Sequence, residues 1–322
     1  MREPHFNGKT FFNPGGPQAH GFRAVLRWML TRTRPQWRYI ATLPAPAPAR
    51  EVRNGELLAT LVGHSTVLLQ FDGFNVLTDP IWSERAGPLS FAGPRRFRAP
   101  AIRLDDLPRI DLVLISHNHY DHLDVSTLRR IARAHSPAAV VPMKLTPWLH
   151  RAGFTRISEL DWWQRASVAE RNGRKLEVTA VPAQHFSARS PFDRNRTLWA
   201  GYVIHAPGGN ILFMGDSAFG QHVHEIAMEF ASPRLALLPI GAYLPQWFMS
   251  PVHMSPVEAL QVHRILRPKL SIAIHHDTFE LADESQGQAV AELQRAARGA
   301  PDELNFIVPE PGAAVSVPRA DG

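Results

Sequence analysis

The run from His117 to His122 reads His-Asn-His-Tyr-Asp-His and places three imidazoles and one carboxylate within six residues. In an extended segment the side chains at i and i+2 point the same way, so His117 and His119 can bind one ion together. Asp121 and His122 follow as the chain turns into the next helix, and we expect them to face a second ion. A buried cluster of this kind is costly unless a cation satisfies the imidazole lone pairs. The alternative, polar residues of a surface loop, is disfavoured because the run directly follows the apolar strand predicted at 111–116.

Two metal ions need more ligands than these four residues supply. Three further residues have suitable side chains and each follows a predicted β-strand: His185 after 176–181, Asp216 after 211–214, and His275 after 270–274. Taken singly, each could be an ordinary polar residue at a strand end. Strands that converge in one sandwich would deliver all three to the same rim and complete a two-metal site.

The composition limits the class of protein. With 322 residues and 44% hydrophobic content, the chain can form one large domain. It has no cysteine, which excludes disulfides, thiolate catalysis and cysteine-based metal sites, so any metal must be bound by His, Asp and Glu. The net charge of +6 suits anionic partners such as phosphate-bearing molecules, anionic lipid headgroups or nucleic acid, although arginine-rich usage can also follow from genomic base composition.

No targeting or membrane-spanning segment is predicted. Residues 1–16 lack a basic start followed by an apolar run, which a secretory signal would need. No uninterrupted apolar run reaches the length of about 18 residues that a membrane-spanning helix requires. We therefore expect a cytoplasmic protein, with any membrane contact being peripheral and at the inner face.

Residues 1–52 are predicted to form an N-terminal extension, and residues 53–322 a single folded domain. The extension contains a basic amphipathic stretch at 21–33, in which five apolar side chains share one helical face: Phe22, Val25, Leu26, Met29 and Leu30. One interpretation is a helix packed on the domain through that face, with its arginines in water. The other is a helix that contacts a membrane surface.

The domain alternates short strands with a few helices. Strands are predicted at 57–62, 66–71, 74–79, 111–116, 138–141, 175–181, 199–205, 210–214, 235–240 and 270–274. Helices are predicted at 126–134, 256–266 and 286–298. Strand-rich segments therefore occupy both halves of the chain, and no fixed period indicates a solenoid or a propeller.

The order of these motifs resembles the metallo-β-lactamase superfamily, and within it the N-acylphosphatidylethanolamine-hydrolysing phospholipase D family. Besides the histidine run, the motifs similar to that branch are Gly63-His64-Ser65-Thr66, Leu77-Thr78-Asp79-Pro80, Gly93-Pro94-Arg95-Arg96-Phe97-Arg98, Glu159-Leu160-Asp161-Trp162-Trp163, Ile240-Gly241-Ala242-Tyr243, Gln246-Trp247-Phe248-Met249 and Ala273-Ile274-His275. The similarity extends from about Leu57 to Phe279 with the motifs in order.

The resemblance implies an α+β fold, a four-layer αβ/βα sandwich with a dimetal site at the edge between its two sheets. It assigns one ion to His117, His119 and His185 and the other to Asp121, His122 and His275, with Asp216 bridging them. Two divalent ions are implied, most simply Zn²⁺, with Mn²⁺ or Fe²⁺ as alternatives. A hydroxide between the ions would attack phosphorus, and Asp121 would thereby serve catalysis as well as metal binding.

The resemblance also implies roles around the metals. His253 is expected to contact the reacting phosphate or to act as a proton donor. Tyr243, Gln246 and Trp247 are expected to bind substrate, although a Trp-Phe pair more often packs at a rim. His64 and Asp79 could orient metal-bound side chains; equally, they could be a turn histidine and an aspartate that caps backbone amides.

The predicted function is a zinc-dependent phosphodiesterase of phospholipase D type, acting on N-acylphosphatidylethanolamine-like lipids. The loop containing Arg95, Arg96 and Arg98 suits a phosphate, which supports this choice. A lactonase, an esterase or another small-molecule phosphodiesterase of the same superfamily is the alternative, and a non-catalytic lipid-binding protein is the second alternative. The expected partners are a small-molecule or phospholipid substrate and a membrane surface, without nucleic acid. The oligomeric state is left open, with a homodimer among the options.

Overall fold

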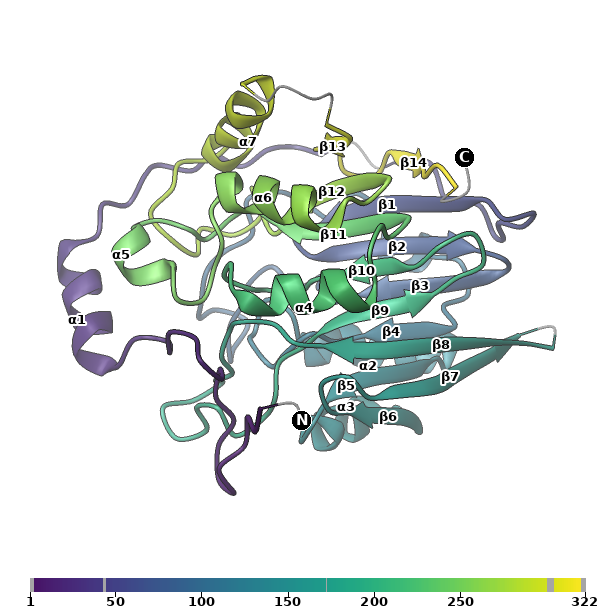
Figure 1. Ribbon diagram of the computed structural model, residues 1–322, viewed down its shortest axis with the longest axis horizontal. Coiled ribbons are helices and arrows are strands. Elements are labelled where there is room, and N and C mark those ends of the chain that lie inside the picture. The colour runs from purple at the N-terminus through teal and green to yellow at the C-terminus, as the bar shows by residue number, and fades with distance from the viewer. Residues whose placement is uncertain (1–2, 43–44, 172, 300–303, 320–322) are drawn as a thin grey trace.

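Two seven-stranded β-sheets packed face to face form the centre of the molecule in the computed structural model (Figure 1), which describes residues 3–42, 45–171, 173–299 and 304–319. The first sheet has the order β14 (Ala314–Ser316), β1 (Leu57–Gly63), β2 (Thr66–Phe71), β3 (Phe74–Thr78), β4 (Leu112–Leu114), β5 (Ala138–Pro142) and β6 (Arg156–Leu160). The second has the order β13 (Phe306–Ile307), β12 (Leu270–Ile274), β11 (Leu235–Pro239), β10 (Ile211–Phe213), β9 (Gly201–His205), β8 (Arg174–Val181) and β7 (Arg165–Arg171).

Alternation along the strands separates the interior of the sandwich from its outer faces. In β5, Ala138 and Val140 belong to the core between the sheets, whereas Ala139 and Val141 face outward into a separate apolar cluster. Because successive side chains of a strand point to opposite faces, an entirely apolar strand needs a cover on both sides. Helices must therefore cover the outer face of each sheet.

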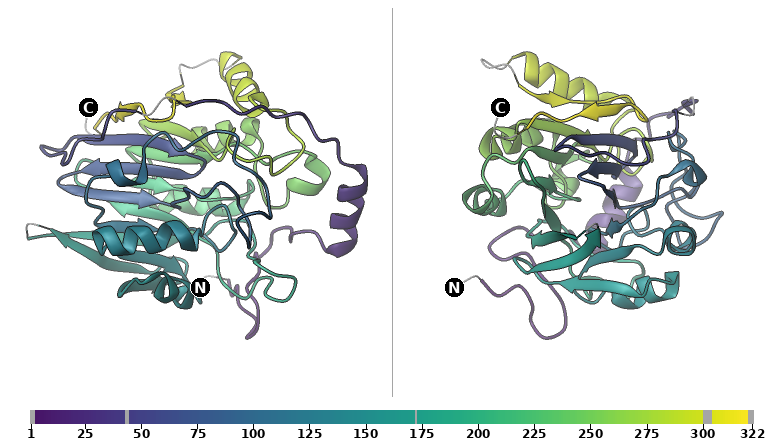
Figure 2. Two further views of the ribbon diagram at one scale, coloured as in Figure 1. Left: turned by 180° about the vertical axis from the view of Figure 1, so that it is seen from behind. Right: turned by 90° about the vertical axis from the view of Figure 1, so that its right-hand side faces the viewer.

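Helices cover both outer faces, as the edge-on view in Figure 2 shows. On the first sheet lie α2 (Val125–His135) and α3 (Thr146–Ala152), and on the second α4 (Gln221–Glu229), α6 (Pro256–Leu266) and α7 (Gln288–Arg298). A short 3₁₀ helix (Leu104–Asp106) and the one-turn helix α5 (Gln246–Met249) lie in loops. The predicted four-layer αβ/βα sandwich is confirmed.

Strand direction brings the predicted ligands to one end of the sandwich. Strands β3 to β6 are parallel, as are β10 to β13, while β8 and β10 each pair antiparallel with β9 and so run the same way. His117 follows β4, and the other three ligand segments follow β8, β10 and β12. Ligands from both sheets thus meet at the edge between them.

The N-terminal extension wraps around this end of the domain, and its helix α1 (Phe22–Thr31) lies at one side of the molecule (Figure 1). Trp28 and Arg32 bind Asp283 through hydrogen bonds of 3.0 and 3.1 Å. Residues 1–2 and 43–44 of the extension lie outside the described residues.

Helix α1 packs on the domain through Trp28, whose ring stacks on Phe248, but most of its predicted apolar face points outward instead of toward the domain. No residue of α1 is fully buried. Its most exposed large apolar side chains are Phe22 (78%), Leu26 (46%), Met29 (59%) and Leu30 (78%). Among the described residues, no helix is long and apolar enough to cross a membrane.

A buried arginine joins the end of the chain to the first sheet, and its removal tests the packing. Arg234 is 1% exposed and donates to the carbonyls of Val317, Pro318 and Gly55. We expect Arg234→Met to lower the free energy of unfolding by about 2–4 kcal/mol, because it leaves buried carbonyls without donors. Urea denaturation measures the effect, with exposed Arg133→Met as the matched control. Equal stability of the two variants would contradict this account.

Candidate metal centre

Three imidazole nitrogens converge at one side of the centre. His117 Nε2 lies 2.8 Å from His119 Nδ1, which lies 3.2 Å from His185 Nε2. The outer ring nitrogens of two of them are held by the protein: His117 Nδ1 is 2.9 Å from the Ser116 hydroxyl, and His185 Nδ1 is 2.8 Å from the Val252 carbonyl oxygen. The nitrogens of this three-histidine group therefore lie close enough together for the group to hold one metal ion.

A second group combines imidazoles with carboxylates. His122 Nε2 and His275 Nε2 lie 3.2 and 3.5 Å from Asp121 Oδ2. The same two nitrogens lie 3.2 and 3.1 Å from Asp216 Oδ2. Asp216 Oδ2 is also 4.0 Å from His117 Nε2 and 3.9 Å from His185 Nε2. Asp216 thus occupies the place of a bridge between this mixed group (Asp121, His122 and His275) and the three-histidine group.

The residues fit two cations. His122 Nε2, His275 Nε2 and Asp216 Oδ1 are buried and form no hydrogen bond. Buried polar atoms without partners are rare in folded proteins because each carries the full cost of its desolvation. A positive ion in each group would give these atoms a partner.

The pKa values show where negative charge is in excess. Burial, followed by neighbouring imidazoles, lowers the pKa of His119 to about 3. Burial also lowers the pKa of His185 to about 4, so both rings are neutral ligands near pH 7. Burial would likewise lower the pKa of His275, but the Asp216 charge and the close contacts of the ring with both carboxylates raise it to about 9. The pKa of His122 rises for the same reason. Positive charge is therefore favoured at the mixed group, where a cation would bind.

Two residues of the first sheet contact the candidate ligands: His64 in the turn between β1 and β2, and Asp79 directly after β3. Asp79 accepts hydrogen bonds from the Ser116 amide at 2.7 Å and the Ser116 hydroxyl at 2.5 Å, and its carboxylate is 2.7 Å from His122 Nδ1. His64 Nε2 is 3.0 Å from Asp121 Oδ2. Through these contacts Asp79 and His64 would orient the side chains of candidate ligands. Both residues have left-handed backbone, with φ of 32° at Asp79 and 56° at His64, a strained state that often marks functional sites.

His253 lies at the mouth of the centre. Its Nδ1 is 3.9 Å from Asp216 Oδ2, and its side chain is 12% exposed. Burial holds its pKa well below the usual value despite the nearby Asp216 carboxylate, so the ring is neutral. A neutral imidazole offers one N–H donor and one acceptor to a bound substrate.

The residues predicted to bind substrate separate into two sets. Gln246 and Trp247 are exposed on α5, at the rim. Tyr243, by contrast, is 2% exposed and packs in the apolar cluster beneath α6 and α7. Its predicted substrate contact is therefore wrong in this structure, because its ring is enclosed by long-range packing.

The arginine loop also differs from its interpretation as a phosphate site. Arg96 is 2% exposed and donates to the carbonyl oxygens of Ile81 and Ser83. Its guanidinium lies 4.8 Å from the centre of the Phe279 ring. Arg96 therefore braces its own loop, and only its neighbours Arg95 and Arg98 keep access to solvent.

No sequence pattern identifies Arg189, which holds the histidine run in place. Its Nη1 donates to the carbonyl oxygens of Asn118 and Leu123 at 2.8 and 2.9 Å. Its guanidinium lies 3.9 Å from the centre of the Tyr120 ring. One cation thus joins both ends of the run to the loop after His185. A surface arginine and a clamp look alike in a sequence, because only the fold shows which carbonyls are near.

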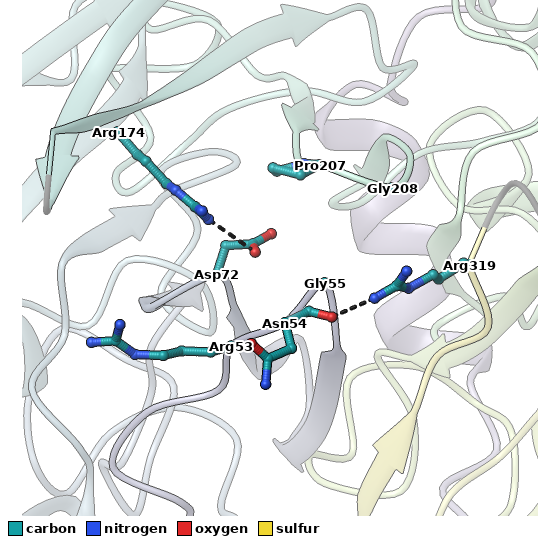
Figure 3. Close-up of a pocket in the computed structure, with 8 residues that line it drawn as sticks. All are labelled: Arg53, Asn54, Gly55, Asp72, Arg174, Pro207, Gly208 and Arg319. Carbon is teal, nitrogen blue, oxygen red and sulfur yellow. Dashed lines mark hydrogen bonds and ion pairs between the residues drawn. The ribbon is translucent and has the colours of Figure 1, made fainter.

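Figure 3 shows a basic hollow of about 680 Å³. It lies at the end of the sandwich opposite to the candidate metal ligands. It is lined by Arg53, Asn54, Gly55, Asp72, Arg174, Pro207, Gly208 and Arg319. These residues lie before β1, at the start of β8, in the turns that follow β2 and β9, and after β14, whereas the candidate ligands follow β4, β8, β10 and β12. Arg174 pairs with Asp72 at 3.1 Å, and Arg319 donates to the Asn54 carbonyl oxygen. These two arginines of the hollow are therefore already engaged by other groups of the protein.

Comparison with known proteins gives a consistent result. Residues 74–276 match the family described as the beta-lactamase superfamily domain. The chain is 35% identical over 298 residues to N-acyl-phosphatidylethanolamine-hydrolyzing phospholipase D 1 of Caenorhabditis elegans, covering 87% of this chain and 83% of that protein. It is 31% identical over 245 residues to the mitochondrial protein so named in Saccharomyces cerevisiae, covering 75% of this chain and 52% of that protein.

A solved structure shares the fold. The metallohydrolase Igni18 of the archaeon Ignicoccus hospitalis superimposes with a TM-score of 0.60 at 24% identity, covering 81% of this chain and 98% of that one. At this identity the likeness concerns the fold alone.

Removal of the Asp79 carboxylate tests the metal centre without touching a ligand. We expect Asp79→Ala to weaken zinc binding about 10–100-fold, because His122 loses the partner that fixes its ring. Competition with a chromogenic chelator measures the affinity. The matched control is Asp72→Ala at the opposite end of the sandwich, which should bind zinc normally. Equal zinc affinities in the two variants would show that Asp79 does not support the site.

Proposed function

The chain belongs to the metallo-β-lactamase superfamily, in the branch of the N-acylphosphatidylethanolamine-hydrolysing phospholipases D. We propose that this metal-dependent hydrolase cleaves phosphodiesters of N-acylphosphatidylethanolamine-like lipids. The observation that carries the proposal is the pairing of two ligand groups through Asp216 Oδ2. Paired metals suit phosphodiester cleavage because they stabilise charge on both the entering and the leaving oxygen.

We propose zinc as the metal of both groups. The donors are five imidazoles and two carboxylates, which suit Zn²⁺ but do not exclude Mn²⁺ or Fe²⁺ on chemical grounds. Bound in the two groups, such ions would supply a water of lowered pKa and would offset charge on the phosphoryl oxygens.

The chain's own residues then have defined tasks. Water adds to phosphorus, the P–O bond to the head-group alcohol breaks, and the alcohol takes the proton, leaving a phosphomonoester. His253 faces the mouth as a neutral ring and can donate its N–H to a phosphoryl oxygen. The exposed rim at Gln246 and Trp247 is where the remainder of the lipid would lie.

We propose further that α1 lies on the membrane beside this mouth. Its exposed residues Phe22, Met29 and Leu30 form an apolar face, and arginines of the same helix suit anionic headgroups. The Trp28 ring stacks on Phe248 of α5 with centroids 4.9 Å apart. The membrane-facing helix would therefore touch the segment that forms the substrate rim. The cytoplasmic location expected from the sequence stays a prediction.

Substrate choice is tested with a panel. The zinc-loaded protein should release N-acylethanolamine from N-acylphosphatidylethanolamine, measured by mass spectrometry, and should hydrolyse bis-p-nitrophenyl phosphate more slowly. Asp216→Ala should lose at least about 10³-fold in kcat/KM and also lose zinc, because the shared carboxylate is removed. Turnover confined to a lactone and ester panel would reject the phospholipase assignment. Zinc binding with no turnover of any substrate would favour the lipid-binding alternative.

Membrane docking is tested by co-sedimentation with vesicles containing anionic phospholipid. A Phe22→Ser/Leu30→Ser variant should bind at least about tenfold more weakly, because two apolar side chains no longer leave water. Val257→Ser, an exposed apolar site on α6, is the control. The Phe22→Ser/Leu30→Ser variant should keep normal activity on a detergent-solubilised substrate. Equal vesicle binding by the unsubstituted protein and both variants would show that α1 does not contact the membrane.

A further inference from the structure

A hollow of about 820 Å³ lies between the N-terminal segment, the segments that follow β6 and β8, and the start of α4. Its walls include the aromatic residues Trp162, Trp163 and Phe219 and the carboxylates of Glu3 and Glu225. We call it the N-terminal hollow. None of the metal ligands lines it, so it is separate from the catalytic mouth.

The charge of this hollow is opposite to that of the protein. The chain carries 35 basic against 29 acidic side chains, yet none of the described residues that line the hollow is lysine or arginine. Within the described part of the chain, Glu3 and Glu225 form no ion pair or hydrogen bond. Two unneutralised carboxylates beside aromatic walls form a local trap for positive charge.

Aromatic walls select the kind of cation. A hydrated metal ion prefers oxygen ligands, and an apolar wall offers it none. An alkylammonium ion, by contrast, gains from ring faces through the cation–π interaction and from carboxylates through charge. It also removes its methyl or methylene groups from water. The Trp162 ring is already stacked on His5, with centroids 4.3 Å apart, so the aromatic contribution rests on Trp163 and Phe219. Together with the Glu225 carboxylate they fit an organic ammonium better than a metal.

The backbone around the hollow is fixed in unusual states. Trp163 has φ of 68°, which is rare for a large side chain, and its amide donates to the Ala180 carbonyl oxygen at 2.6 Å. A Cβ at Gly16 would lie 2.6 Å from Gln184 Oε1, so only glycine allows the N-terminal segment to approach this closely. The walls are thus built by close packing and are present before any ligand arrives.

Two residues that line the hollow contact the segments that carry His185 and Asp216. Asn13, one of its lining residues, donates to the His185 carbonyl oxygen at 2.9 Å. His222, another, has its Nε2 2.9 Å from the hydroxyl of Ser217, the residue after Asp216. From the rings, the free carboxylates and the preformed walls, we propose that the N-terminal hollow binds a small organic ammonium ion. The proposal does not depend on the reaction catalysed at the metals.

The test uses the full-length zinc-loaded protein with three probes: choline, ethanolamine and 3,3-dimethylbutan-1-ol, the uncharged isostere of choline. Isothermal titration calorimetry should detect binding of the two ammonium ions, and the alcohol should bind at least about tenfold more weakly because it lacks the charge. Equal binding of choline and the alcohol, or no binding of either ammonium ion, would overturn the proposal.

Variants locate the binding. The double variant Glu3→Gln/Glu225→Gln and the single variant Phe219→Leu should each weaken choline binding at least about fivefold. Glu229→Gln, on the same face-exposed helix α4 but outside the hollow, is the matched control and should bind normally. Circular dichroism checks that each variant folds.

Asp216→Ala separates this site from the metal centre. It should lose zinc and turnover but keep its choline affinity, whereas loss of choline binding would place the ammonium at the metals and refute the N-terminal hollow. An unchanged affinity in the Glu3→Gln/Glu225→Gln variant would refute it as well. Failure of the phospholipase assay leaves both measurements interpretable, since neither uses catalysis.

Discussion

The structure depends on the buried carboxylate of Asp216, which is 3% exposed and lies between two groups of ligands. An ionised carboxylate removed from water is costly unless positive charge lies close to it. Accordingly, the Asp216 charge raises the pKa values of the neighbouring His122 and His275. Cations bound in the two groups would supply that positive charge, which couples metal binding to proton release and to the packing of both sheets.

Two sheets with a common strand direction meet this constraint. The first sheet contributes the histidine run after β4, and the second contributes single ligands after β8, β10 and β12. Contacts outside the ligands then fix the loops, with Asp79 holding His122 and Arg189 closing the run. The N-terminal extension completes the arrangement, because Asn13 binds the His185 backbone and α1 borders α5.

Local patterns predicted most of the fold. The strand at 66–71, the strand at 270–274 and the helix at 256–266 have the predicted bounds, because continuous apolar runs and the Ser255 capping box are local signals. Strand β7 was missed because its residues alternate between partial and full exposure, which leaves no apolar run. Helix α4 was missed as well; it begins after Gly220 without a side-chain cap.

The sequence by itself determined the chemistry, since ligand types, their spacing at strand ends and the absence of cysteine are properties of the chain. Only the tertiary structure decided which other side chains reach the site. It buried Tyr243 and Arg96, turned the apolar face of α1 outward and made Arg189 a clamp. The physical reason is that burial and hydrogen-bond partners arise from contacts between distant segments, and no local pattern encodes them.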